Sequence, residues 1–509
     1  MPSFHILMET QTKRFRIGTS AYHVRKGDRN AEAEAKDPGA EYMKIKIWAG
    51  LITLVLAAVI LRSYCTPQPA ALRMAAQPET GRQEARRGGS GDAEAVLKTE
   101  GTETEGSEIS RREEGSIRVL LKNDDFQDAF HERLEITGTG AFWVQKGGSR
   151  TVYEAGEKLK LEPETGQDWN GGKIEVSSAM PDGRLQILNL KRGDAPPAYP
   201  GKFEITWQTE GYLVINELGL EEYLPAVLSS EMNASFPAEA LKAQAVCART
   251  YAAKRIEEKN SGCFGADLDD SVSYQVYNNK SSDESTQKAV RDTEGLVLWK
   301  DGELADTFYY STSCGATEAD SFSEEETLAR FLEEGRESDL EFEEPWYRWR
   351  TAVSEEEIRQ NLTEMGLEAP ERIAAVTVLQ REETGRARLL EIGGDDRILQ
   401  ISGEYDIRQA LAPDQEICLK DGSSSRPLGL LPSAWFVLEP EKEETADQEA
   451  ESGAAEKTWA VLGGGFGHGN GLSQNGAGRM AGSGADCETI LGFYYDNIQI
   501  GPWDRRGER

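Results

Sequence analysis

Residues 223–252 read YLPAVLSSEMNASFPAEALKAQAVCARTYA, and this stretch predicts two helices joined by a short corner. The first helix, expected over 220–232, has a stripe of residues at the helical spacing i, i+3, i+4 and i+7: Leu224, Val227, Leu228 and Glu231. Pro237 begins the second helix, because proline is tolerated in a first turn. The buried stripe of the second helix is expected to be Leu241, Ala245, Ala248 and Ala252. The first stripe therefore ends in a carboxylate on the face that should be buried.

Glu231 has two interpretations on the residues alone. A carboxyl group held against apolar side chains is disfavoured as an anion, so its pKa should rise, which suits a general acid near neutral pH. Alternatively, Glu231 reaches the surface at the helix end or pairs with Lys242 or Arg249. Structural ion pairs are commoner than catalytic acids, so these residues by themselves favour the structural role.

The overall composition excludes several classes of function. The chain has 509 residues, enough for two or three domains, and 57 basic against 89 acidic residues give a net charge of −32. This excess of acid argues against nucleic acid, and against an anionic membrane surface, as a main partner. Of only four histidines, His131 and His468 lie beyond the first 42 residues. A multi-histidine metal site is therefore disfavoured, and no cofactor is expected.

The N-terminal part predicts an exported protein. Residues 43–64 read MKIKIWAGLITLVLAAVILRSY, in which cations precede an apolar run of 15 residues. We interpret this segment as a retained signal anchor, a single span of the cell membrane that leaves the following domain outside the cytoplasm; a cleaved signal peptide is the alternative. Residues 1–42 lack apolar periodicity and are interpreted as a disordered, non-native extension upstream of a biological start at Met43. Residues 65–115 contain almost no aromatic residues and are expected to form a disordered linker.

The remaining sequence predicts an α+β fold in which a β-rich region precedes the helical stretch. Short β-branched and aromatic runs, separated by turn residues, include IRVLL, FWVQ, TVYEA, KIEVS, KFEITWQ and YLVINEL. We assign 116–345 to this region and the catalytic core, 346–437 to a small inserted α+β subdomain, and 438–458 to an acidic insertion without an assigned role. Residues 459–505, with a glycine-rich motif and C-terminal helices, are expected to complete the core.

The glycine-rich motif, GGGFGHGNGLSQNGAGRMA at 463–481, is a candidate ligand site. Its glycines allow positive φ and the close approach of a bulky ligand. No register fits G-x-G-x-x-G and no P-loop lysine follows, so nucleotide binding is excluded. His468 is a candidate hydrogen-bond donor to substrate or an orienting group, and Ser473 and Gln474 precede a helix that runs through Met480. A tight structural loop is the alternative.

A second polar segment, FYYSTSCGATEAD at 308–320, combines aromatic rings with hydroxyl groups. Sugar rings have apolar faces for stacking and hydroxyl edges for hydrogen bonds, so this segment suits a sugar ligand. An alternative pairs Cys314 with His468 as thiol nucleophile and base, although no third member of such a triad is evident.

Seven motifs in order resemble the stage II sporulation protein D family, which are peptidoglycan lytic transglycosylases of spore-forming bacteria. They are EEYLPAVLSSEM, EALKAQAVCARTYA, QVY at 275–277, YYSTSCGATE, PWYRW at 345–349, GFGHGNGLSQNGAGRMA and ILGFYY at 490–495. The resemblance covers roughly residues 116–505. It implies an anchored, extracytoplasmic enzyme that cleaves the bond between N-acetylmuramic acid and N-acetylglucosamine in peptide-stripped glycan strands during engulfment of the forespore.

The resemblance also implies roles for individual residues and partners. The glutamate of the S-E-M motif is the family's catalytic acid, which here is Glu231. That single carboxyl group protonates the leaving oxygen and then deprotonates the muramic C6 hydroxyl, which closes a 1,6-anhydro ring. The matching motifs suggest the following substrate-binding residues: Gln275, Tyr277, Tyr310, Ser311, Thr312, Ser313, His468 and Gln474. The implied partners are an amidase, stage II sporulation protein P, and the membrane protein stage II sporulation protein M.

Two points qualify what the resemblance implies. Some similar proteins carry a zinc-binding Cys/His cluster before the QVY motif, whereas this chain keeps Cys263 but has Asp269, Ser273 and Tyr274, so no metal site is expected. Related proteins act as amidase enhancers, which bind glycan without cutting it. A non-catalytic amidase enhancer is therefore the alternative function.

Overall fold

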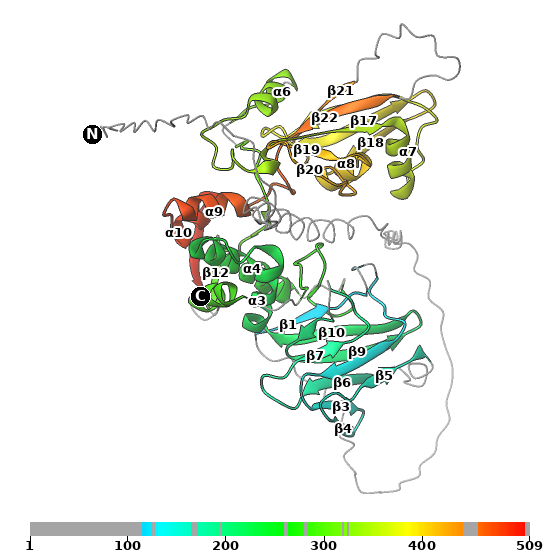
Figure 1. Cartoon of the computed structure of the whole chain (residues 1–509), viewed down its shortest axis with the longest axis vertical. Helices are drawn as coiled ribbons and strands as arrows, with labels where there is room; N and C mark the ends of the chain where they lie inside the picture. The colour runs from blue at the N-terminus through cyan, green and yellow to red at the C-terminus, as the bar shows by residue number, and fades with distance from the viewer. Residues whose placement is uncertain are drawn as a thin grey trace, which may run out of the picture. The chain divides into compact units, whose positions relative to one another are not determined.

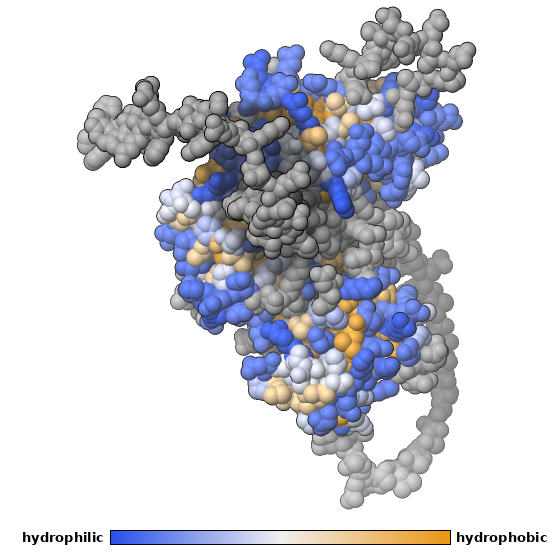
Figure 2. All heavy atoms as spheres, viewed as in Figure 1, coloured by the Kyte–Doolittle hydropathy of each residue, from blue (hydrophilic) through white to orange (hydrophobic). Residues whose placement is uncertain are grey.

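The computed structural model describes residues 115–503 except for short gaps at 124–125, 127, 164–171, 193–195, 259–262, 279–282, 318–319, 323–324 and 441–456. The expected extension (1–42), the signal anchor (43–64) and nearly all of the linker lie outside the described residues, as does most of the acidic insertion. No helix in the described part of the chain is both long and apolar enough to cross a membrane. The face seen in Figure 2 is largely hydrophilic, with smaller hydrophobic areas between the hydrophilic residues.

The β-rich region forms a seven-stranded sheet in the order β11-β1-β10-β9-β6-β3-β4 (Figure 1). Its strands are β1 (Ser116–Leu120), β3 (Phe142–Lys146), β4 (Ser149–Tyr153), β6 (Lys173–Ser178), β9 (Lys202–Gln208), β10 (Gly211–Gly219) and β11 (Leu268–Asp269). The β1–β11 pair is parallel, and β1 pairs antiparallel with β10. In β9 the apolar residues Phe203 and Ile205 are buried while their neighbours are partly exposed, which is the alternation expected of a strand with one face in the core.

A second, four-stranded sheet in the order β5-β2-β7-β8 packs into the same core. Its strands are β2 (Leu134–Gly138), β5 (Leu159–Leu161), β7 (Leu185–Ile187) and β8 (Ala198–Tyr199). The long strand β10 leads directly into the first helix of the opening stretch. The sheets therefore fix where that helix begins.

The two predicted helices are confirmed as α3 (Leu220–Glu231) and α4 (Ala238–Glu258). The alanine-rich α4 is contacted by three further helices: α5 (Glu284–Asp292), α9 (Gln474–Gly482) and α10 (Cys487–Tyr494). Figure 1 shows the C-terminal α9 and α10, in red, beside the green α4. Strand β24 (Ile498–Pro502) joins β12 (Leu296–Lys300) and β13 (Glu303–Leu304) in a three-stranded sheet. The C-terminal segment thus completes the core that contains α3 and α4.

A second hydrophobic core lies in the segment between these parts. Its five-stranded sheet, β20-β19-β15-β22-β21, contains β15 (Trp349–Ser354), β19 (Ile417–Leu419), β20 (Ser424–Ser425), β21 (Phe436–Pro440) and β22 (Thr458–Gly463). Its three-stranded sheet contains β16 (Ile373–Arg381), β17 (Ala387–Gly394) and β18 (Ile398–Ser402). The remaining elements are α6 (Glu325–Glu334), the 3-10 helix η3 (Pro345–Tyr347), α7 (Glu355–Glu364) and α8 (Glu404–Ala410).

This arrangement corrects one boundary drawn from the sequence. Strand β22 was assigned to the C-terminal segment that starts at residue 459, but it pairs with β15 and β21 and belongs to the sheet of the inserted subdomain. The reason is that Trp459 and Val461 are buried in the second core.

The polar segment and the glycine-rich motif run beside each other. Strand β14 (Tyr309–Tyr310) pairs in parallel with β23 (Leu472–Ser473), and Thr312 forms an antiparallel bridge with Phe466. Strand β14 is short because β23 provides only two paired residues before α9 begins.

Candidate functional site

Glu231 is the last residue of α3, at the corner before α4. Its Oε1 atom accepts a hydrogen bond of 2.9 Å from the backbone N–H of Val276. Its backbone carbonyl accepts a hydrogen bond of 3.3 Å from Nε2 of Gln474. The catalytic candidate is therefore held by two segments that are distant in sequence.

The cations that could have neutralised Glu231 are engaged elsewhere. Arg249 donates from Nε and Nη2 to both carboxylate oxygens of Glu221, at 2.7 and 2.8 Å. Lys242 pairs with Glu239 at 2.8 Å and lies 3.6 Å from Asp292. Among the described residues, Glu231 has no ion pair. The interpretation of Glu231 as a partner of Lys242 or Arg249 is therefore wrong.

The environment of Glu231 favours the protonated carboxyl group. Burial raises the pKa of Glu231 to about 7, and the hydrogen bond from Val276 opposes this rise in part. The residue as a whole is only partly buried, whereas the pKa follows the enclosed surroundings of the carboxyl group. Both the acid and the carboxylate are then populated near neutral pH, as a group that gives and later takes a proton requires.

Tyrosine hydroxyls and a buried amide lie around Glu231. Gln275 is fully buried, and its side chain accepts a hydrogen bond from Tyr223 Oη (3.3 Å) and donates to Tyr309 Oη (3.3 Å) and to the carbonyl of Ala248 (3.2 Å). Burial, and next the charge of Glu231, holds the pKa of Tyr309 well above its usual range. Tyr309 therefore stays a neutral hydroxyl close to the carboxyl group.

The QVY motif is placed differently from the expectation. Gln275 positions the tyrosines, and Tyr277 is fully buried, with its hydroxyl donating to Asn216 at 3.1 Å and its ring packed on Tyr223. These positions do not support direct contact of Gln275 or Tyr277 with a glycan. The residue between them, Val276, is the one that reaches Glu231, and it does so through a backbone N–H that carries no side-chain signal in the sequence.

His468 uses both ring nitrogens within the protein. Nε2 lies 3.0 Å from the carbonyl of Tyr309, and Nδ1 accepts the N–H of Asn470 at 3.0 Å, so the proton is on Nε2. Burial lowers the pKa of His468, which keeps the ring neutral. Of the two roles suggested by the sequence, this geometry fits the orienting group that ties the glycine-rich motif to β14.

The cysteine alternative is not supported by the geometry. Cys314 is buried, and burial raises the pKa of its thiol to about 11, whereas a nucleophile requires a thiolate near neutral pH. His468, its suggested base, already bonds Tyr309 and Asn470.

The glycine-rich motif follows the protein's own backbone closely. Gly471 has φ +73°, and a Cβ atom there would lie 2.0 Å from the carbonyl oxygen of Phe308. The sequence suggested that such glycines allow a ligand to approach. At this position the alternative of a tight structural loop is the better description.

The predicted sugar-binding residues at 310–313 lie beside the N-terminus of α9. The ring of Tyr310 packs on that of His468 at 5.8 Å, and Ser311 accepts the N–H of Asn475 on its carbonyl at 3.0 Å. Thr312 is buried, and its Oγ1 accepts from Asn475 Nδ2 at 2.9 Å. Tyr310, Ser311 and Ser313 remain partly exposed. These three are therefore better placed for a ligand than the buried Thr312.

A buried carboxyl group that the sequence did not single out is Glu341. Its Oε1 accepts the N–H of Ser313 at 2.9 Å and the hydroxyl of Ser473 at 2.6 Å, and the residue is 4% exposed. Burial raises the pKa of Glu341 to about 7. In the sequence it lies in an acidic run, EEGRESDLEFEE, and its position four residues before the PWYRW motif was the only available signal.

The helix that Glu341 anchors leads to the catalytic candidate. Ser473 is the N-cap of α9, and the next residue, Gln474, donates to the carbonyl of Glu231. Glu341 therefore holds the polar segment to the start of α9, and the next residue of that helix, Gln474, bonds the backbone of Glu231.

The segment before the QVY motif contains Cys263, which is buried. Cys263 donates a hydrogen bond of 3.2 Å from its thiol to Tyr274 Oη. Within the residues that the structure describes, no group of three or more His, Cys, Asp or Glu side chains is arranged to hold a metal ion.

Comparisons with known proteins divide the chain into two matched parts. A family described as stage II sporulation protein matches residues 208–299, which include Glu231, and a family described as a domain of unknown function (DUF8618) matches residues 303–471.

Three similar proteins illustrate the relatives of this chain. An uncharacterised protein of Brachyspira hyodysenteriae is 29% identical over 308 residues, which are 60% of this chain and 73% of that protein. Stage II sporulation protein D of Bacillus subtilis is 29% identical over 307 residues, which are 57% of this chain and 76% of that protein. The amidase enhancer of Bacillus subtilis is 27% identical over 305 residues, which are 54% of this chain and 40% of that protein.

Proposed function

Because the chain carries a stage II sporulation protein D domain, we propose that it is a lytic transglycosylase that acts on the cell wall during sporulation. Its substrate would be the bond between N-acetylmuramic acid and N-acetylglucosamine in glycan strands without stem peptides. The observation that carries the proposal is the state of Glu231: a carboxyl group with a pKa near 7, no cation partner among the described residues, and one N–H donor.

The mechanism uses this carboxyl group twice. Protonated Glu231 donates its proton to the glycosidic oxygen, so the bond to C1 of the muramic residue breaks and the N-acetylglucosamine hydroxyl leaves. The carboxylate then removes the proton from the C6 hydroxyl as O6 attacks C1 and closes the 1,6-anhydro ring. The proton is back on Glu231, no water is consumed, and no second carboxylate is needed, unlike in most glycoside hydrolases.

The neighbouring groups support both states of Glu231. The N–H of Val276 continues to donate when the carboxyl group is ionised, which stabilises the anion between the two steps. The buried surroundings keep the acid form available at the start. Tyr309 is neutral, and the hydrogen bond from Gln275 holds its hydroxyl group in a fixed position near the carboxyl group of Glu231.

The cellular setting is part of the same proposal. The apolar segment at 43–64 would anchor the enzyme in the cell membrane with its catalytic domain outside the cytoplasm. The partners would be the peptide-stripping amidase, stage II sporulation protein P, and the membrane protein stage II sporulation protein M.

A non-catalytic amidase enhancer is the second candidate function. It is favoured by the similarity to the amidase enhancer of Bacillus subtilis, although this chain covers only 40% of that protein. Such a protein would bind glycan through the same surfaces without using Glu231 as an acid.

The decisive experiment is digestion of amidase-treated sacculi by the full chain, with mass spectrometry of the released fragments. The enzyme predicts products ending in 1,6-anhydro-muramic acid, and Glu231→Gln should release them about 10³-fold more slowly. Glutamine keeps the acceptor for the N–H of Val276, so the variant tests proton transfer while the local structure is retained. Glycan binding without anhydro products from the wild type would reject the enzyme and leave the amidase enhancer.

A further inference from the structure

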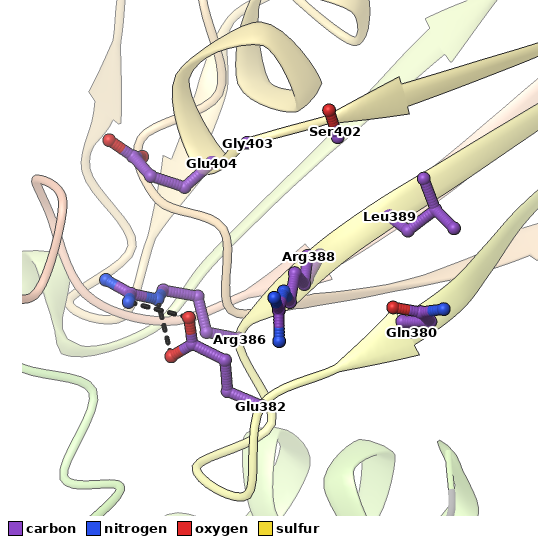
Figure 3. A pocket seen from close by; sticks show the side chains of 9 residues that line it. Gln380, Glu382, Arg386, Arg388, Leu389, Ser402, Gly403 and Glu404 are labelled. Carbon is purple, nitrogen blue, oxygen red and sulfur yellow. Dashed lines mark hydrogen bonds and ion pairs between the residues drawn. The ribbon is translucent and has the colours of Figure 1, made fainter.

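A pocket of about 430 Å³ opens on the inserted subdomain, against the β16–β17 hairpin and the turn from β18 into α8 (Figure 3). Its polar lining includes Gln380, Arg388, Ser402 and Glu404. Its volume falls in the usual range for small-ligand sites. None of these residues was singled out by the motifs that identify the catalytic domain.

Arg386 joins this pocket to the glycine-rich motif. Arg386 lines the pocket, and its Nη1 donates to the carbonyl of His468 at 2.6 Å and to Oδ1 of Asn470 at 2.8 Å. His468 in turn bonds the carbonyl of Tyr309, the tyrosine beside Glu231. A short chain of direct contacts thus connects the pocket with the candidate catalytic site.

The charges in the pocket leave one cation without a partner. Arg386 is held by both carboxylate oxygens of Glu382, at 2.8 and 3.0 Å, as the dashed lines in Figure 3 show. Glu404 pairs with Arg408 at 2.9 Å. Arg388, in contrast, is exposed, and its guanidinium forms no ion pair with any residue of the described part of the chain. On a chain with a net charge of −32, this arginine is suited to an anion from outside.

The other lining groups fit a sugar better than a simple anion. Gln380 and Ser402 offer an amide and a hydroxyl to hydrogen-bond with ring substituents, and Leu389 adds an apolar contact. A ligand that has hydroxyls, an amide and one carboxylate would satisfy all of these groups.

We propose that this pocket binds a muramic acid residue of the glycan strand and that Arg388 pairs with the free carboxylate of its lactyl group. The inference rests on the proposed function. Once the stem peptide is removed, this carboxylate carries a negative charge, whereas in peptide-bearing glycan it is an uncharged and bulky amide. Arg388 is therefore a specificity-determining residue that favours peptide-free strands.

The test compares two probes that differ only in this charge. The first probe is a set of peptide-free glycan oligosaccharides, and the second is the same set with every lactyl carboxylate converted to its N-methylamide. Calorimetric titration of the full chain carrying Glu231→Gln, which prevents turnover, should show about fivefold tighter binding of the free acid, the size expected for one exposed charge pair. Adding Arg388→Gln should remove this preference.

Arg372→Gln is the matched control. Arg372 is an exposed arginine of the same subdomain outside the pocket, so its loss changes the net charge equally and should leave the preference intact. Equal affinity for both probes, a preference that survives Arg388→Gln, or no binding of either probe would each overturn the inference.

The outcome stays separate from that of the proposed function. Release of anhydro products by the wild type without a carboxylate preference would reject the pocket alone. A carboxylate preference that depends on Arg388, without anhydro products, would support the pocket and reject the enzyme.

Discussion

Two buried carboxyl groups with the same pKa, about 7, differ in how they are held. Glu341 is 4% exposed and accepts two hydrogen bonds on Oε1, one from the N–H of Ser313 and one from the hydroxyl of Ser473. Glu231 is partly exposed and accepts a single N–H, that of Val276. A raised pKa alone therefore does not identify a catalytic acid. The carboxyl group must also have an oxygen that can reach a substrate.

The largest expected effect is a difference in activity between variants of Glu231 and variants of Glu341. Glu231→Gln should lower the rate of anhydro-product release by about 10³-fold, because it removes the proposed general acid. Glu341→Gln should lower the rate by less than about tenfold, because Glu341 touches only the protein and acts through α9. Initial rates on peptide-free glycan, measured by mass spectrometry, give both values. Equal losses in the two variants would mean that the pair was assigned the wrong roles.

The loss of stability should be larger for a substitution at Glu341 than for one at Glu231, which reverses the order expected for activity. Glu341→Ala leaves the N–H of Ser313 and the hydroxyl of Ser473 without their buried acceptor, so it should lower the free energy of unfolding by about 3 kcal/mol. Glu231→Ala frees one N–H at a partly exposed corner and should cost about 1 kcal/mol. Denaturant unfolding of the two variants beside the wild type measures this difference at pH 4, where both carboxyl groups are protonated in the folded protein. A larger loss for Glu231→Ala would contradict the comparison.

The dependence of stability on pH should distinguish Glu231 from a paired surface carboxylate. Its pKa in the folded protein is raised to about 7, so its protonated form stabilises the fold below the ordinary pKa of about 4.5. This contribution is lost as the pH rises through 7. Glu231→Gln cannot ionise, so the variant should match the wild type at pH 4 and exceed it by on the order of 2 kcal/mol at pH 8.

Unfolding curves at the two pH values test this expectation. A variant that is destabilised at pH 8 would show that the carboxylate of Glu231 is favoured by the fold. The activity should follow the same protonation, with kcat/KM falling as the pH rises above about 7, because the first step needs the acid form.

The comparison also shows which features could be predicted from sequence. The helices α3 and α4 were predictable because their apolar stripes and the opening proline are local signals. The raised pKa of Glu231 followed from its place on the first stripe. Glu341 was not predictable in the same way, because its partner Ser473 is 132 residues away and nothing near Glu341 in the sequence indicates that contact. The donor to Glu231 was hidden for another reason: it is a backbone N–H, which every residue except proline carries.

The expected placement of Tyr277 illustrates the limit of transferring roles by motif. The motif match drew attention to the segment, but Tyr277 is fully buried and its side chain contacts Asn216 and Tyr223. A motif can therefore lie next to a site while the side chains that define the motif are buried in the core. The backbone between them can be the part that reaches the catalytic group.

The smallest expected effects come from two adjacent residues of α9 that serve the two carboxyl groups separately. Gln474 donates to the carbonyl of Glu231 at 3.3 Å, and Asn475 donates from Nδ2 to Thr312 at 2.9 Å, on the side that Glu341 holds. Gln474→Ala should reduce the rate about threefold and change the free energy of unfolding by less than about 1 kcal/mol, because its hydrogen bond is long and partly exposed.

Asn475→Ala should do the opposite, lowering the free energy of unfolding by about 1 to 2 kcal/mol with a rate within about twofold of the wild type, because Thr312 is buried. The two variants remove side-chain amides from neighbouring positions of one helix, so a general loss of helix stability would affect both alike. Opposite responses in rate and stability would show that α9 has two separate roles. Gln474 would fix the position of Glu231, and Asn475 would hold the polar segment through Thr312. Parallel responses would mean that α9 acts as a single support, and the distinction between the two carboxyl groups would then rest on Glu231 and Glu341 alone.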